Sequence, residues 1–110
     1  YLSAMGWEIL ARNWRIRGGE LDLVARSGKK LIFVEVRYRR ANALIPAEFS
    51  LSHHKLRYLI RAARIFLQRS KFAMEARSWA EEFQFDVLVL REDGSFHHIP
   101  EAFTCNNVYR

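Results

Sequence analysis

Hydrophobic and polar positions in the first third of the chain predict a β-hairpin. Residues 20–26 (ELDLVAR) alternate between apolar and polar, which is typical of a half-buried strand. Residues 31–38 (LIFVEVRY) are mostly β-branched, aromatic or aliphatic and predict a well-buried strand. The polar tetrad between them, Ser27 to Lys30, is a turn signal, so the two strands are expected to pair antiparallel.

The rest of the pattern predicts further strands around one long helix. Apolar residues between about 52 and 69 recur at helical spacing, and Arg57, Arg61 and Arg64 form a separate polar stripe. A loop containing Pro46 is expected before this helix, and a polar connection over residues 70–82 after it. Other segments are predicted as strands or as the last turn of a helix whose start is absent: strands at 7–15, 83–90 and 95–99, and the turn at 1–6.

This order of elements predicts one α/β domain over residues 1–110. Its core is expected to be a central mixed β-sheet flanked by helices, in the order αβββαβ with the first helix truncated. Gly18 and Gly19 are expected to form the turn into the second strand. Asp86 lies in an apolar strand and must have polar partners if it is buried. His97 and His98 are adjacent in a strand, so they should point to opposite faces.

The charge of the chain and its cysteine content indicate which binding partners and which cellular compartment to expect. The formal net charge is +6, from 18 Lys and Arg against 12 Asp and Glu, and most of the basic residues are Arg. Such a surface favours polyanions, with nucleic acid first and anionic membrane second, and the guanidinium fork matches phosphate. The sequence contains no transmembrane run and no secretory signal. Cys105 is the single cysteine and allows no internal disulfide, which fits a cytoplasmic protein.

Two carboxylates in the predicted hairpin are the best candidates for a metal site. If Ser27 pairs with Lys30, Asp22 lies opposite Glu35, and the two side chains share one face of the sheet. Facing carboxylates repel, and their oxygens suit Mg²⁺ or Mn²⁺, which also bind phosphate. Glu20 then lies opposite Arg37, which points to the same face as Glu35. A structural ion cluster of these four side chains explains the same spacing without a metal.

The residues of this hairpin also resemble a known family. The pattern GGELDLVAR followed by LIFVEVRYR, with the AMGWEILARNWR start and the FQFDVLVL strand, is similar to the YraN family of small bacterial proteins. That family is similar to the restriction-endonuclease-like, PD-(D/E)xK, nucleases and to archaeal Holliday-junction resolvases. The resemblance implies that Asp22 and Glu35 bind metal in a phosphodiesterase site, with Arg37 where such nucleases usually have Lys. Those of the resolvase type also carry a Glu on the first helix, which is mostly missing here.

Basic residues outside the hairpin are candidates for binding phosphate. Arg57, Arg61 and Arg64, with Lys55 nearby, could follow a nucleic-acid backbone, although a merely solvated helix face would have the same spacing. Two more arginines directly follow the predicted site and are expected at its rim: Arg39 and Arg40.

Three functions remain open from the sequence. The first is a nucleic-acid-binding endonuclease, with DNA the expected substrate, Asp22 and Glu35 holding the ion, Arg37 steadying phosphate or water, and Glu20 supporting them. The second is an inactive nucleic-acid-binding module on the same fold. The third is a small protein-interaction or assembly module, and a homodimer is compatible with each of them.

Overall fold

The computed structural model describes residues 2–40, 52–71 and 73–103 and contains two helices among five strands. Its elements in chain order are the 3₁₀ turn η1 (Ser3–Met5), β1 (Glu8–Ile16), β2 (Gly19–Ser27), β3 (Lys30–Arg39), α1 (His53–Arg69), α2 (Ala73–Trp79), β4 (Glu82–Arg91) and β5 (Phe96–Phe103). The loop around Pro46 and the lone Cys105, both considered in the sequence analysis, lie outside the described residues.

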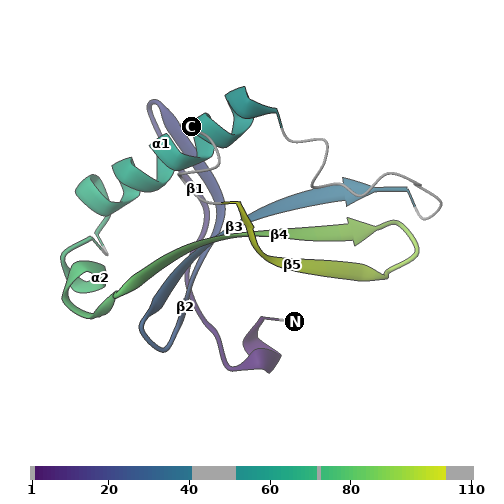
Figure 1. Ribbon diagram of the computed structural model, residues 1–110, viewed down its shortest axis with the longest axis horizontal. Coiled ribbons are helices and arrows are strands. Elements are labelled where there is room, and N and C mark those ends of the chain that lie inside the picture. Colours follow the sequence, from purple (N-terminus) through teal and green to yellow (C-terminus); the bar gives the residue numbers. More distant parts are fainter. Residues whose placement is uncertain (1, 41–51, 72, 104–110) are drawn as a thin grey trace.

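The five strands form one mixed sheet in the order β1-β2-β3-β4-β5. The pairs β1–β2, β2–β3 and β4–β5 are antiparallel, whereas β3 and β4 run parallel over their whole length. A parallel neighbour requires the chain to cross back over the sheet, and α1 and α2 lie in this crossover (Figure 1). The mixed sheet expected from the sequence is therefore confirmed.

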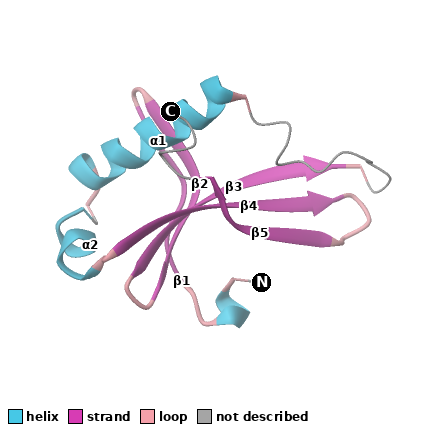
Figure 2. Cartoon of the chain, viewed as in Figure 1, coloured by secondary structure: helices cyan, strands magenta, loops and turns pink. Residues whose placement is uncertain are grey.

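The two faces of the sheet are covered differently (Figure 2). Both helices pack on one face, where Phe66 of α1 contacts Trp14 and Phe33 edge-on and lies in the larger apolar cluster. On the other face a smaller cluster forms around Leu2 and three strand residues: Ile32, Val34 and Leu88. No helix among the described residues has both the length and the apolar character needed to span a membrane.

Helix α1 lies close to strand β2 because two glycines stand where the chain enters that strand. Gly18 has a φ of +89°, a left-handed conformation that favours glycine, and forms the expected turn. Gly19 is buried, and a Cβ atom added there would lie 3.5 Å from both Ala62 Cα and Ile65 Cδ1. A side chain longer than a methyl group would have to displace the helix.

The predicted strand bounds differ from the observed ones by one residue at most ends, but two segments differ more. Residues 70–82 were expected to be a polar connection and instead include α2, so that prediction is wrong. Ala76 of this short helix is buried in the larger cluster, a tertiary contact that the local pattern does not indicate. The edge strand predicted at 95–99 extends to Phe103, and Pro100 is tolerated because an edge strand has one unpaired side.

The Gly19 contact predicts a difference between two substitutions. Gly19→Ala adds a methyl group at ordinary contact distance and should leave the free energy of unfolding nearly unchanged. Gly19→Leu should lower it by about 1–3 kcal/mol, the usual range for overpacking. Denaturant unfolding of both variants measures this. Equal stability of the two variants would contradict the close approach of α1.

Candidate functional site

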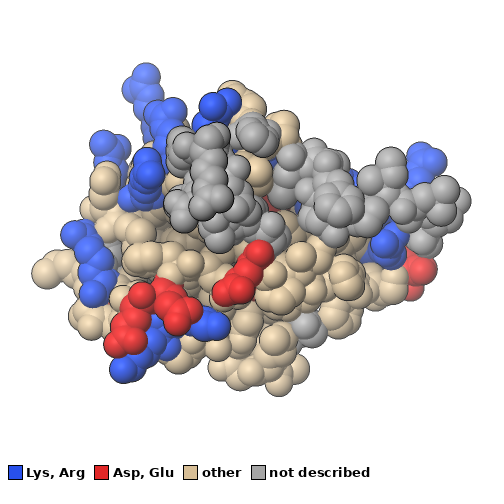
Figure 3. Space-filling view, viewed as in Figure 1, with Lys and Arg blue, Asp and Glu red and all other residues tan. Residues whose placement is uncertain are grey.

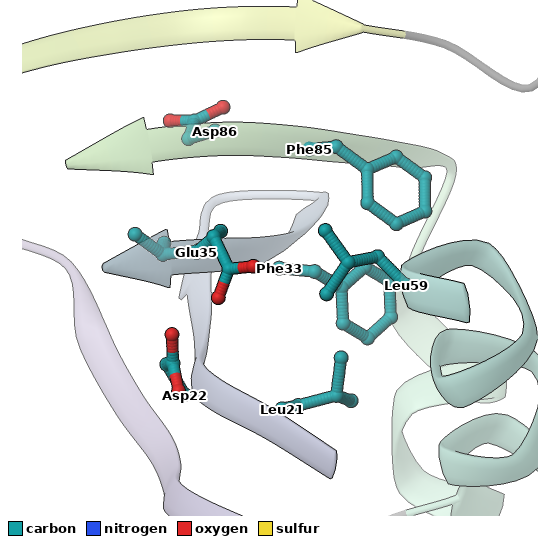
Figure 4. A pocket seen from close by; sticks show the side chains of 8 residues that line it. Leu21, Asp22, Phe33, Glu35, Leu59, Phe85 and Asp86 are labelled. Atoms are coloured by element: carbon teal, nitrogen blue, oxygen red, sulfur yellow. The ribbon is translucent and has the colours of Figure 1, made fainter. Parts of the chain in front are cut away.

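The β2–β3 hairpin places Asp22 and Glu35 beside each other. The paired residues run from Ser27 opposite Lys30 to Leu23 opposite Val34, which is the predicted register. The pairing ends one step before Asp22 would meet Glu35. At this point a side chain replaces the backbone as the hydrogen-bond acceptor: Asp22 Oδ2 accepts a hydrogen bond from the backbone N–H of Val36 at 2.9 Å. The side chains of Asp22 and Glu35 point toward each other (Figure 4), as predicted.

The two carboxylates border a small cavity at the end of the apolar core. Its volume is about 10 Å³, close to the minimum for one water molecule. The apolar part of its wall comes from strands β2, β3 and β4 and from helix α1: Leu21, Phe33, Val34, Phe85 and Leu59. Glu35 is buried, with a relative exposure of 8%, whereas Asp22 is half-buried. The Asp22–Glu35 pair therefore lies at the boundary between the apolar core and solvent.

Burial changes the acidity of Glu35. The pKa of its carboxyl is raised from 4.5 to about 7, first by loss of hydration and then by the hydrogen bond with Asp22 and the charge of that neighbour. Lys55 opposes these effects and lowers the same pKa. In the metal-free protein, protonation of Glu35 thus relieves repulsion between the facing carboxyl groups.

The cation beside the pair is Lys55 of α1. Its Nζ lies 3.2 Å from Glu35 Oε2. From the sequence, Lys55 was expected to act with the nearby arginine stripe, but its ammonium is directed to Glu35. Lys55 precedes Leu59 by one helical turn, so the two share a side of α1. That Leu59 lines the cavity follows only from the fold, so the sequence alone could not place Lys55 at the carboxylates.

The other two residues expected at the carboxylates are placed less centrally. Arg37 is half-buried on β3, two residues beyond Glu35, and so shares its face of the strand. Glu20 forms an ion pair with Arg15 on the neighbouring strand β1, with Oε1 3.2 Å from Nε. This pair is at the β1–β2 turn and is largely exposed, and Glu20 is not among the residues that line the cavity.

Arg57, Arg61 and Arg64 are exposed along α1. The guanidinium of Arg61 reaches the β1–β2 turn, because its Nη2 is 3.7 Å from the position of a Cβ on Gly18. Figure 3 shows Lys and Arg side chains gathered at the side of the molecule where α1 and this turn lie. The arginines expected at the rim lie at the end of β3: Arg39 is half-buried, and Arg40 is exposed.

Asp86 borders the same cavity but belongs to a separate polar group. It is fully buried on β4, and its carboxylate accepts hydrogen bonds from Gln84 Nε2 at 2.9 Å and Glu101 N at 3.0 Å. His98 Nε2 lies 2.6 Å from its other oxygen. The expectation that a buried Asp86 has polar partners is confirmed, and His97 and His98 differ in burial as strand alternation requires.

The donor set at the cavity fits a small divalent ion that keeps other ligands. Asp22 and Glu35 offer carboxylate oxygens, and Mg²⁺ is commonly held by one or two carboxylates together with water and substrate phosphate. Across residues 2–40, 52–71 and 73–103, no three His, Cys, Asp or Glu side chains come together as a metal-binding group. Asp22 and Glu35 can therefore hold such an ion only together with further ligands, such as water or substrate phosphate.

The raised pKa of Glu35 predicts how stability depends on pH. Between pH 4.5 and about 7 the folded protein holds a proton that the unfolded chain has lost, so the free energy of unfolding falls as pH rises. The contribution is fully present below pH 4.5 and is lost as pH rises through about 7. It amounts to about 3–4 kcal/mol, at about 1.4 kcal/mol per pKa unit.

Denaturant unfolding of metal-free protein at several pH values measures this slope. Glu35→Gln should remove it, whereas Glu20→Gln, a change at an exposed ion pair, should retain it. A slope unchanged in Glu35→Gln would show that other groups cause the pH dependence.

Comparison with known proteins places the chain among bacterial relatives. A UPF0102 protein of Hahella chejuensis is 39% identical over 108 residues, which cover 96% of this chain and 82% of the relative. One from Pseudomonas putida is 42% identical over 111 residues, covering 96% and 85%. One from Nitratidesulfovibrio vulgaris is 37% identical over 105 residues, covering 93% and 74%. The profile described as "Uncharacterised protein family UPF0102" matches residues 1–90, and the chain belongs to this family.

Proposed function

We propose that this protein binds nucleic acid and hydrolyses phosphodiester bonds with a divalent metal ion, Mg²⁺ or Mn²⁺, held by Asp22 and Glu35. The observation that carries the proposal is the pair of carboxylates facing each other at the cavity beside α1. Burying such a pair is costly, and a divalent cation is the ligand that best offsets the cost. DNA is the proposed substrate class.

The topology supports a restriction-endonuclease-like core for this function. Three antiparallel strands lead into a helical crossover and a parallel fourth strand, which is the arrangement that the sequence resemblance implies. Both carboxylates stand on the central strands β2 and β3, where the hairpin and the core on both sides hold the backbone in place.

The chain's own residues would hold and orient the reacting groups. The backbone N–H of Val36 fixes the Asp22 carboxylate, and the apolar wall of the cavity keeps bulk water from Glu35. In the reaction, the oxygen of water bonds to phosphorus, the bond to one ester oxygen breaks, and that oxygen takes a proton. A bound divalent ion would activate the water and offset charge on the phosphate. Arg37, on the same face of β3, would steady phosphate or water.

The exposed arginines of α1 are proposed to hold the nucleic-acid backbone. Arg57 and Arg64 are seven residues apart, which is about 10 Å along a helix at about 1.5 Å per residue. Phosphates of one DNA strand advance about 3.4 Å along the axis for each base, so the stripe spans about three of them. Arg39 and Arg40 are proposed to contact phosphate at the end of β3.

A nucleic-acid-binding module without catalysis is the second candidate. One observation favours it: the raised pKa of Glu35 and the ammonium of Lys55 both reduce the negative charge at the carboxylates without a metal. The two candidates differ in whether a divalent ion displaces the proton of Glu35 and this ammonium.

Catalysis is tested with full-length protein, Mg²⁺ or Mn²⁺, and branched, single-stranded and duplex DNA. Cleavage should require the ion and fall by about 100-fold or more in both Asp22→Asn and Glu35→Gln, because each removes a ligand charge at the reacting centre. Glu20→Gln, at the exposed ion pair with Arg15, provides a matched carboxylate-to-amide control. Activity that survives both ligand substitutions, or that is absent on every substrate, excludes the hydrolytic function.

Binding is tested by reversing Arg57, Arg61 and Arg64 to Glu and measuring DNA affinity at several salt concentrations. Each lost phosphate contact should reduce the slope of log affinity against log salt by about one. A control with the same change in net charge reverses exposed basic residues of other elements: Arg12, Lys29 and Arg77. The α1 variant should lose affinity more strongly than the control. Equal losses would show that only overall charge matters.

A further inference from the structure

Lys55 lies in the first turn of α1, on a different face from the exposed arginines. Residues three and four positions later, Tyr58 and Leu59, are half-buried and buried, respectively, and Leu59 lines the cavity. The Lys55 side chain is 38% exposed while its Nζ is 3.2 Å from Glu35 Oε2. It therefore lies between the solvent and the buried carboxylate.

Two contacts hold this lysine in place. Its backbone N–H donates to Ser52 Oγ at 3.1 Å, which caps the helix and fixes where α1 begins. Its ammonium is 5.2 Å from the centre of the Tyr58 ring, within the range of a cation–π contact. The ammonium is thus directed by the helix start and by the ring, in addition to its attraction to Glu35.

The net charge of the site with a divalent ion bound indicates what the Lys55 ammonium would do there. Two carboxylates and one divalent ion cancel, so the site by itself offers no net attraction to a phosphodiester anion. Lys55 adds one positive charge within the same group of side chains. Divalent ions and the ammonium also compete for Glu35, because both are attracted to the same oxygens.

We infer that Lys55 is a catalytic residue of this site: its ammonium leaves Glu35 when a divalent ion binds there and then contacts a non-bridging oxygen of the substrate phosphate. This role rests on the proposed function. It differs from that of the arginine stripe, which holds phosphates away from the reacting centre. It also differs from a structural ion pair, in which Lys55 would serve only to neutralise Glu35.

The test uses full-length protein and compares wild type with Lys55→Met and Lys29→Met. Lys29 is a matched control, because its Nζ also lies 3.3 Å from a glutamate oxygen, that of Glu81, at the far end of the hairpin. Three quantities are measured for each: Mn²⁺ affinity without DNA, affinity for DNA with Ca²⁺ in place of Mn²⁺, and the rate of cleavage with Mn²⁺.

If Lys55 competes with metal and then contacts phosphate, Lys55→Met should bind Mn²⁺ as tightly as wild type or more tightly. It should bind DNA with Ca²⁺ less tightly and cleave DNA with Mn²⁺ about 100-fold more slowly, the usual loss when one charged or polar donor at a reacting centre is removed. Lys29→Met should match wild type in all three. Weaker Mn²⁺ binding by Lys55→Met, or cleavage within about twofold of wild type, overturns the role.

Failure of the proposed hydrolysis is recognised separately. A wild type that cleaves no DNA excludes the hydrolytic function, and the DNA affinity measured with Ca²⁺ then decides whether Lys55 contacts phosphate. Equal affinity in wild type and Lys55→Met overturns that contact. If thermal unfolding shows that Lys55→Met is not folded, Lys55→Gln replaces it with the same criteria.

Discussion

The close approach of helix α1 to strand β2 is the constraint on which the rest of this structure depends. Gly19 has no side chain where Ala62 crosses it, so the helix lies directly on the sheet. This contact sets the height of α1 above the core, where Phe66 fills the space between the helix and Phe33. The same placement turns the arginines outward and brings the first turn of the helix to the carboxylates. Core packing and the candidate site thus share one geometric cause.

Placing Glu35 beside Asp22 at the edge of the apolar core is electrostatically unfavourable for the folded protein. Glu35 is buried against apolar residues and faces Asp22, and both features favour its protonated form. A well-packed apolar side chain at that position would avoid this cost, and this is the physical basis on which a ligand at the pair is proposed. The raised pKa of Glu35 and the ammonium of Lys55 both lower the cost of this arrangement in the metal-free protein.

The candidate binding surface and the candidate reacting centre lie on the same side of the sheet. Both depend on α1: Lys55 and Leu59 face the cavity, while Arg61 reaches outward to the β1–β2 turn. A polyanion held along the outer face of the helix would therefore pass near its first turn, where Lys55 contacts Glu35. Asp86 and His98 form a separate buried group on β4 and β5, which explains how a third acidic residue can border the cavity without joining the pair.

Local patterns of the sequence determined the strands, the helix α1, the hairpin register and the facing of Asp22 and Glu35. These follow from the period of apolar residues and from a turn of even length, both of which act over a few residues. The position of Lys55 was decided only by the tertiary structure, because a helix can meet a sheet at many heights and angles and its polar residues look alike in sequence. The short helix α2 was missed for the same reason: the burial of Ala76 depends on packing against a core built from distant segments. The raised pKa of Glu35 also needed the fold, since desolvation arises from residues such as Leu59 and Phe85 that the chain brings together only when it is folded.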